Sequence, residues 1–392
     1  MPRSVKVLSG LVAGSALPAP LIPLTDCSPD RWRELPVARL RRSLLDWYAH
    51  HGRELPWRRT EDLYAIWVSE IMLQQTQVKT VIPYYERWLQ AFPAVGQLAQ
   101  ANQQTVLMNW QGLGYYARAR NLHRAAQSII ADYGGQFPEQ MADVLKLPGI
   151  GRTTAGGILS AALNQPYPIL DGNVKRVLAR LIGLSVPPNH ALSWLWEGSE
   201  TLLDATHPRA FNQALMDLGA TVCTPKQPQC DRCPWATFCQ AHQLNLQSVL
   251  PMSETRQPLP HKRIGVAVIW NSHGQILIDK RPQSGLLGGL WEFPGGKVEP
   301  NETIPECIAR EIQEELGIQV EVGEHLITLD HAYTHFKVTL SVHHCRHLSG
   351  EPQPIECDEV KWVSLGDLDQ YPFPTANHKI IAALQSGERP FR

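Results

Sequence analysis

Apolar residues recur at three- and four-residue spacing from Pro36 to Leu246, which is the pattern of amphipathic helices. Glycine and proline pairs such as Gly134-Gly135 interrupt this pattern and separate one helical segment from the next. The pattern predicts an all-α domain of roughly ten helices over residues 36–246.

The pattern changes after this helical domain. Residues 247–261 are rich in proline and polar side chains, which predicts an extended linker. Beyond it, runs rich in β-branched residues predict strands, and one amphipathic helix is predicted between Thr303 and Leu316. Residues 262–385 are therefore expected to form an α+β domain, followed by a tail, 386–392. The predicted strands are IGVAVIW, QILID, VTLSVHHC and VKWVSL.

The chain has 392 residues, 43% hydrophobic and 19% charged, which suits two globular domains. No apolar run reaches the roughly 18 residues of a membrane span, so we expect an aqueous setting and no membrane partner. Residues 1–35 contain an apolar stretch that faintly resembles a signal peptide, but glycines and prolines interrupt it. We expect these residues to form a disordered leader.

The net charge of −1 conceals an asymmetry between the two halves of the chain. Residues 1–260 carry 24 Lys and Arg against 19 Asp and Glu, a net charge of +5. Residues 261–392 carry 12 against 18, a net charge of −6. The two halves are therefore expected to differ in function, and the basic surplus suits the half that would meet phosphates.

Four of the eight cysteines fall within 17 residues, with the spacing C-x6-C-x2-C-x5-C. Such a cluster in a long chain indicates a metal or iron-sulfur site rather than a disulfide framework. Structural zinc sites usually use two short C-x2-4-C pairs, and only one is present, so the spacing favours iron-sulfur but leaves zinc open. The four are Cys223, Cys230, Cys233 and Cys239.

The segment LPGIG, residues 147–151, joins two amphipathic segments. Gly149 and Gly151 would let the backbone approach a ligand closely, and the N–H groups of the following helix would form a site for a DNA phosphate. An ordinary tight turn between helices fits the pattern equally well.

Two carboxylates lie in or beside predicted helices. Glu70 has apolar residues on both sides of its helix, so burial should raise its pKa and let it donate a proton near pH 7. A structural glutamate bonded to the backbone would fit this position equally well. Asp171 precedes a predicted helix and is by itself more typical of a helix-capping aspartate.

Seven motifs together carry a family resemblance that covers nearly all of residues 36–245. The chain resembles the helix-hairpin-helix DNA glycosylases, and among them the adenine-specific MutY type. The motifs are the four-cysteine loop, LPWR (55–58), SEIMLQQTQV (69–78), GLGYYARARNL (112–122), LPGIGRTTAGGIL (147–159), ILDGNVKRVLARL (169–181) and FNQALMDLGA (211–220).

This resemblance implies a 4Fe-4S cluster on the four cysteines and a double-stranded DNA substrate with adenine opposite 8-oxoguanine or guanine. It also implies that adenine is flipped out of the duplex. Glu70 would protonate N7 of the adenine and help to activate water, and Asp171 would stabilise the oxocarbenium-like sugar. Relatives that also cleave the strand have a lysine where this chain has Thr153, so we expect a monofunctional glycosylase with Lys175 as an inefficient trap of the opened sugar. We also expect a cytoplasmic, DNA-associated monomer.

The resemblance also implies a set of residues that contact DNA. Gln74, Gln75 and Tyr115 match positions that wedge into the base stack and hold the opposing strand. Without the resemblance, Tyr115 and its neighbour Tyr116 would also fit as core aromatics. The remaining expected contacts are Gly149, Gly151, Thr153 and Lys175.

The acidic half contains every fixed position of the Nudix pattern G-x5-E-x7-R-E-U-x-E-E-x-G-U. Glu311, Glu314 and Glu315 would project within about 100° of helical arc. Like charges this close repel unless they share a cation, and their oxygens suit Mg²⁺ bridging to a diphosphate. A solvated acidic helix face is the alternative. The matching residues are Gly296, Glu302, Arg310, Glu311, Ile312, Glu314, Glu315, Gly317 and Ile318.

The second half resembles the MutT-type 8-oxo-dGTP diphosphatases in WEFPGGK (291–297) and FPTAN (373–377), which implies that Asn377 binds the oxidised guanine. The loop HAYTHF (331–336) instead resembles the MutY-type lesion reader, with Thr334 and His335 as its contacts. Two functions stay open for this half, an Mg²⁺-dependent diphosphatase and a non-catalytic module that recognises 8-oxoguanine. Glu356 and Glu359 are equal candidates for a further carboxylate outside the box.

Overall fold

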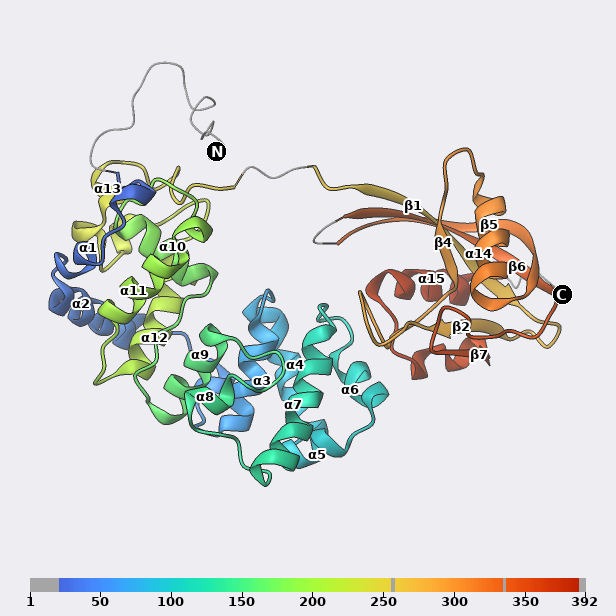
Figure 1. Cartoon of the computed structure of the whole chain (residues 1–392), viewed down its shortest axis with the longest axis horizontal. Helices are drawn as coiled ribbons and strands as arrows, with labels where there is room; N and C mark the ends of the chain where they lie inside the picture. The colour runs from blue at the N-terminus through green and yellow to red at the C-terminus, as the bar shows by residue number, and fades with distance from the viewer. Residues whose placement is uncertain (1–20, 255–257, 334–335, 388–392) are drawn as a thin grey trace, which may run out of the picture. The chain divides into compact units, whose positions relative to one another are not determined.

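The computed structural model describes residues 21–254, 258–333 and 336–387, which form two compact units (Figure 1). Among these residues, no helix has the length and apolarity that a membrane crossing needs. The first unit takes the described residues of Met1–Glu70, Glu139–Lys146 and Ile150–Thr255, and the second takes those of Ile71–Pro138, Leu147–Gly149 and Arg256–Arg392.

The first unit is helical, as the spacing of its apolar residues predicts. Its helices are η1 (Leu24–Asp26), α1 (Asp30–Arg33), α2 (Val37–His51), η2 (Pro56–Arg58), α8 (Met141–Val144), α9 (Arg152–Leu163), α10 (Gly172–Leu181), η3 (Pro188–Ala191), α11 (Leu192–Leu202), α12 (Pro208–Asp217), η4 (Leu218–Val222), η5 (Cys230–Arg232), η6 (Ala236–Phe238) and α13 (Gln240–Gln243). Helix α3 (Leu63–Leu73) begins in this unit and ends in the second.

The expectation of a disordered leader over residues 1–35 is wrong for its described part, residues 21–35. Trp32 is fully buried, and its indole N–H donates to the carbonyl of Trp194 at 3.0 Å. The two rings lie 4.9 Å apart, and the backbone of Ile22 forms a bridge to Leu184. The glycines and prolines that interrupt the apolar pattern conceal these anchors, because each anchor is a single residue rather than a periodic face.

The second unit begins with helices α4 (Val78–Ala91), α5 (Val95–Gln100), α6 (Gln103–Trp110) and α7 (Ala117–Tyr133). Trp88 packs edge-on against both Phe92 and Trp110, with ring centroids 4.9 and 5.4 Å apart. These three rings form the aromatic centre of this helical part. The apolar residues that recur every three or four positions in α4 and α6 therefore lie on one buried face of each helix.

The rest of the second unit is a mixed sheet in the order β3-β2-β1-β6-β5, with β4 paired to β1 and β7 paired to β2. Strands β1 and β6 run parallel, and the other pairs are antiparallel. The elements are β1 (His261–Trp270), β2 (Ile276–Lys280), β3 (Trp291–Glu292), β4 (Gly295–Lys297), α14 (Ile304–Leu316), β5 (Gln319–Ala332), β6 (Lys337–Ser349), β7 (Glu359–Val363), η7 (Leu365–Gln370) and α15 (Thr375–Ser386).

The sheet has a hydrophobic cluster on each face, one that includes residues of α14 and one that includes residues of α15. Helix α14 matches the predicted helix, and Thr303 and Glu306 form a capping box at its start. The sequence pattern did not predict the short strands β3 and β4, the long strand β5 or helix α15. Register shifts along β5 disturb its two-residue alternation, and α15 directly follows a proline-containing turn.

Candidate functional sites

Glu70 lies near the end of α3, on a helix whose residues Trp67, Val68 and Ile71 are buried. A Cβ on Gly157 of α9 would come within 2.7 Å of Oε2 of Glu70, so the glycine leaves room for this carboxyl group. Desolvation raises the pKa of Glu70 to about 7, the negative charge of Asp171 adds to the rise, and Arg58 opposes it. Glu70 can therefore carry a proton at neutral pH and give it up.

Asp171 is the N-cap of α10 and also an electrostatic neighbour of Glu70. Its Oδ1 accepts from the backbone N–H of Val174 at 2.7 Å, and its Oδ2 accepts from the side chain of Asn173 at 3.1 Å. The two interpretations of Asp171, a helix cap and a carboxylate of a paired site, are compatible. The cap fixes the carboxylate at the helix start, close to Glu70.

A buried ion-pair network behind Glu70 was not identified from the sequence. Asp217, at the end of α12, is fully buried and accepts two hydrogen bonds of 2.8 Å from the guanidinium group of Arg58. Arg53 donates to the same carboxylate through its backbone N–H and its Nε. Burial disfavours ionisation, but these bonds hold the pKa of Asp217 below its ordinary value. Both LPWR and FNQALMDLGA contain members of this network.

The hairpin glycines differ in their surroundings. Gly149 has a φ of +80°, and a Cβ there would come 2.7 Å from Cβ of Asn121, so this position requires glycine. Gly151 has open space and precedes α9 as its N-cap, with Thr153 in the first turn of that helix. The Lys175 ammonium group donates to the side chain of Asn189 at 3.1 Å, so in this structure it is turned to another partner than Asp171.

The three proposed wedge residues lie in the second unit. Gln75 and Tyr115 both have positive φ angles, of 58° and 49°, which are uncommon for such residues and cluster at functional positions. Buried Arg118 holds both segments, because it donates to the carbonyls of Gln74 and Gly114. Tyr115 is 45% exposed whereas Tyr116 is buried, so of this pair only Tyr116 is a core residue.

The four clustered cysteines line one small cavity in the first unit. Burial raises the pKa of Cys233 to about 12 and that of Cys239 to about 11, so these thiols would ionise only when a positively charged group binds them. Arg180 is almost fully buried beside them and donates to Sγ of Cys223 at 3.3 Å. The set of donors and the adjacent cation suit an anionic thiolate cluster.

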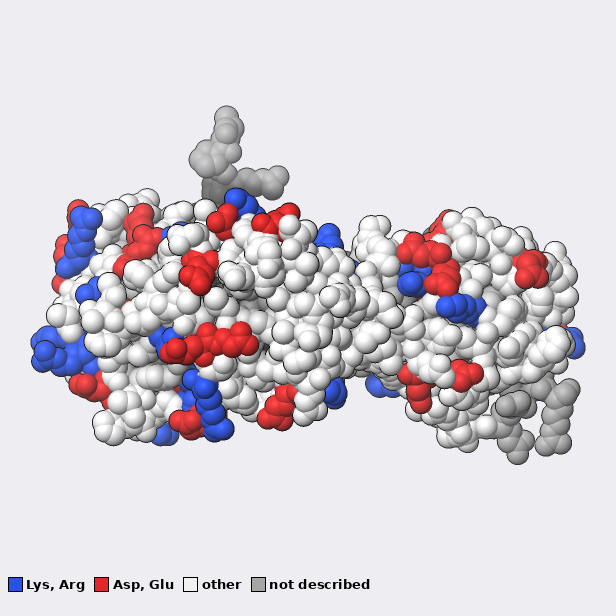
Figure 2. Space-filling view, turned by 90° about the horizontal axis from the view of Figure 1, so that it is seen from below, with Lys and Arg blue, Asp and Glu red and all other residues white. Residues whose placement is uncertain are grey.

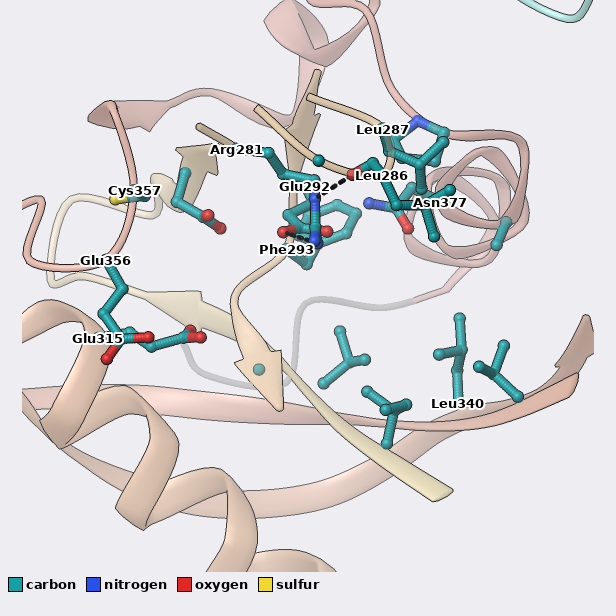
Figure 3. A pocket seen from close by; sticks show the side chains of 18 of the residues that line it. Arg281, Leu286, Leu287, Glu292, Phe293, Glu315, Leu340, Glu356, Cys357 and Asn377 are labelled. Carbon is teal, nitrogen blue, oxygen red and sulfur yellow. Dashed lines mark hydrogen bonds and ion pairs between the residues drawn. The ribbon is translucent and has the colours of Figure 1, made fainter. Parts of the chain in front are cut away.

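A second cavity, of about 520 Å³, opens in the sheet part of the second unit (Figure 3). Glu315 and Glu356 lie at one end, the side chain of Asn377 at the other, and the paired Arg281 and Glu292 between them. Arg281 donates to Glu292 at 2.6 Å. Desolvation raises the pKa of Glu315 to about 8, and the charges of Glu311, Glu292 and Glu356 add to the rise.

The residues of the Nudix pattern differ in their contacts, and they do not all line the cavity. Arg310 forms ion pairs with Glu302, Glu311 and Glu314, and Glu314 is half exposed. A Cβ on Gly296 would overlap the Glu311 carboxylate, so this glycine makes room for it. Of the three box carboxylates, Glu315 alone lines the cavity.

The structure distinguishes the two candidates for the further carboxylate. Glu356 lines the cavity, whereas Glu359 is paired with Lys280 and Lys361. Asn377 is 7% exposed, and its Nδ2 has no hydrogen-bond partner among the described residues. Thr334 and His335 lie outside the described residues.

Basic and acidic side chains are interspersed on the face shown in Figure 2, rather than gathered into one basic stripe. No three His, Cys, Asp or Glu side chains of the described residues stand in a ready-made metal-holding geometry. The support for metal at either site is therefore the set of donors around each cavity, and not a preformed coordination sphere.

Three family models match successive parts of the chain. Residues 68–192 match the model of the HhH-GPD superfamily base excision DNA repair proteins, residues 223–239 match the iron-sulfur binding domain of endonuclease III, and residues 265–383 match the NUDIX domain. The predicted fold class, an all-α helix-hairpin-helix domain with an iron-sulfur loop followed by an α+β Nudix domain, is confirmed.

Relatives are similar over most of the chain. An adenine DNA glycosylase of Rattus norvegicus is 34% identical over 90% of this chain and 79% of its own length. That of Homo sapiens is 35% identical over 90% and 75%, and that of Buchnera aphidicola (subsp. Acyrthosiphon pisum) is 37% identical over 75% and 82%. This chain is a DNA N-glycosylase of base excision repair that binds an iron-sulfur cluster, and it belongs to the adenine DNA glycosylase family.

Proposed function

We propose that the chain removes adenine mispaired with 8-oxoguanine or guanine, with Glu70 as the proton donor. The observation that carries this proposal is the partly buried Glu70 carboxyl group, whose pKa is raised to about 7 beside Asp171. A group with this pKa combines a large protonated fraction at neutral pH with an adequate tendency to release the proton.

In the proposed reaction, neutral Glu70 gives its proton to N7 of a flipped adenine. The bond between the sugar and the base then breaks, and its electron pair leaves with the base. The Asp171 carboxylate stabilises the positive charge that develops on the sugar. Glu70, now ionised, accepts a proton from the water that adds to the sugar. Thr153 provides no amine for strand cleavage, which supports a monofunctional reaction.

Substitution of Glu70 by Gln tests this proposal, because the amide keeps the shape of the side chain but cannot donate the proton. We expect Glu70→Gln to abolish release of adenine from an adenine:8-oxoguanine duplex while binding to that duplex is retained. Glu61→Gln is the matched control, since Glu61 is exposed and paired with Arg209. Undiminished adenine release by Glu70→Gln would refute the role of Glu70.

A second activity is proposed for the Nudix half, hydrolysis of an oxidised purine nucleoside triphosphate such as 8-oxo-dGTP. It is favoured by the buried Nδ2 of Asn377, which lies in the same cavity as Glu315 and Glu356 and has no partner among the described residues. A cavity of about 520 Å³ suits a nucleotide. Glu315 and Glu356 would hold Mg²⁺ there, with Glu311 nearby, and the ion would neutralise the diphosphate.

The competing proposal for this half is a lesion-recognition module without catalysis. The full chain should be incubated with 8-oxo-dGTP and Mg²⁺, and release of pyrophosphate should be measured. We expect turnover that Glu315→Gln abolishes, while the control Glu321→Gln, on the exposed side of β5, retains it. Absence of turnover in the unsubstituted chain would favour the recognition module, and turnover that survives Glu315→Gln would contradict the role proposed for Glu315.

A further inference from the structure

A buried carboxylate of the Nudix cavity has no role in the functions proposed so far. Asp279, on β2, is 5% exposed, and its Oδ1 has no hydrogen-bond partner among the described residues. The side chain lines the cavity. A buried acceptor without a partner is costly to a folded protein, so its retention inside a cavity indicates a ligand that completes the bond.

The register of the strands places Asp279 within the row of polar groups along the cavity. Residues two apart on a strand share a face, so Asp279 lies on the same side of the sheet as Leu277, which packs with residues of α14. Asp279 lies directly opposite Glu292 in the pairing of β2 with β3. It is also close enough to Glu315 of α14 to interact with it electrostatically.

These positions give the cavity an order from one end to the other. Glu315 and Glu356 occupy one end, Asn377 the other, and the Arg281–Glu292 pair the middle (Figure 3). Asp279 interacts with both Glu292 and Glu315, so it belongs between the middle pair and the acidic end. Cys357, which follows Glu356, is also an electrostatic neighbour of Asp279.

A nucleotide has the same linear order, with a base, a sugar and phosphates. If the base lies against Asn377 and the metal-bound phosphates lie at the acidic end, the sugar lies next to Asp279. Burial raises the pKa of Asp279 well above its ordinary value, and the charges of Glu292 and Glu315 add to the rise, which favours a neutral carboxyl group. The oxygen of such a group can accept a hydrogen bond from a sugar hydroxyl. We propose that Asp279 binds the sugar of the nucleotide by accepting a hydrogen bond from its hydroxyl group, an inference that rests on the nucleotide function proposed above.

The test compares two nucleotides that differ only in that hydroxyl group. The full chain is titrated in a calorimeter with 8-oxo-dGMP and with its 2′,3′-dideoxy form, so that neither turnover nor Mg²⁺ is needed. We expect the unsubstituted chain to bind 8-oxo-dGMP up to about tenfold more tightly than the dideoxy form, the effect of one hydrogen bond. Asp279→Ala should bind both nucleotides with the affinity that the unsubstituted chain has for the dideoxy form.

Two further variants serve as controls for this test. Asp279→Asn keeps an acceptor oxygen at the same place and should retain part of the preference for the hydroxyl group. Asp330→Ala removes an exposed aspartate from β5, outside the cavity, and should retain all of it.

The outcomes separate this inference from the function on which it rests. If the unsubstituted chain binds neither nucleotide, the nucleotide function of the cavity fails. If it binds both equally, or if Asp279→Ala keeps the preference, the cavity binds nucleotides but Asp279 does not bind the sugar. Loss of the preference in Asp279→Ala, with affinity for the dideoxy form unchanged, supports the proposal.

Discussion

Arg180 offers a sharp test of how the iron-sulfur loop is held. It lies on α10, and only 1% of its surface is exposed. Its guanidinium group donates to the carbonyls of Leu250, Thr224 and Pro225, at 2.6, 2.7 and 3.1 Å, and to Sγ of Cys223. The Arg180 side chain therefore joins Thr224 and Pro225, which follow the first cysteine, to Leu250, which lies beyond the last cysteine.

Substitution of Arg180 by Met would keep the apolar stem and remove all four of these hydrogen bonds. Each bond from a charged donor contributes about 1.5–3 kcal/mol, but such contributions do not add, and relief from burying the charge offsets part of the loss. Each buried carbonyl that is left without a donor costs about 1–3 kcal/mol, so the net loss should be about 3–5 kcal/mol. We therefore expect Arg180→Met to destabilise the first unit by about this amount and to lower its content of bound cluster.

Iron per chain and visible absorbance of the purified protein measure cluster content, and thermal unfolding followed by circular dichroism measures stability. Arg232→Met is the matched control, because Arg232 lies in the same loop but its side chain, among the described residues, donates only to the nearby side chain of Gln229. A full complement of iron in Arg180→Met, with unfolding free energy within about 1 kcal/mol of the unsubstituted chain, would refute this account of the loop.

Three other predictions concern the first unit. Asp217→Asn leaves Arg53 and Arg58 without their buried anion, and we expect it to cost about 3–5 kcal/mol in chemical denaturation. Thr153→Lys should add strand cleavage to adenine release, detected as a shortened DNA product without alkali, and absence of that product would contradict the role assigned to this position. Glu70→Gln should stabilise the fold at pH 8 but not near pH 4. Because the folded pKa is raised to about 7 from 4.5, the cost of ionising Glu70 grows as the pH rises from 4.5 to 7 and stays constant above. Denaturant titrations at both pH values measure this difference, which should reach on the order of 3 kcal/mol.

The sequence predicted those features that depend on local patterns. The helix ending at Leu316 has an apolar face and a capping box at Thr303, so its position follows from spacing and cap chemistry alone. The four cysteines, Glu70 and Asp171 stand within motifs of several residues each. Burial of Glu70 could be predicted from its helix, and the structure adds a second cause of its raised pKa, the charge of Asp171, which lies about a hundred residues later in the chain.

Features that depend on strand pairing or long-range contacts could not be predicted in this way. Asp279 is one acidic residue in an otherwise ordinary strand, and its importance depends on its place opposite Glu292 and near Glu315. Asp217 follows a helical apolar pattern, and only folding brings Arg58 to it. Trp32 likewise becomes an anchor only through contact with Trp194.

The central claim is that Glu70 delivers its proton to adenine, and the pH dependence of a single turnover tests it most directly. The rate constant for adenine release from an adenine:8-oxoguanine duplex should be measured between pH 5.5 and 9, with binding to the duplex checked at each pH. Because the protonated form is the active one and its pKa is about 7, the rate should be constant below that pH and fall about tenfold per unit above it. Asp171 raises this pKa, so the midpoint in Asp171→Asn should move to lower pH in whatever activity remains. A rate that stays constant from pH 6 to 9 with intact binding would contradict the claim.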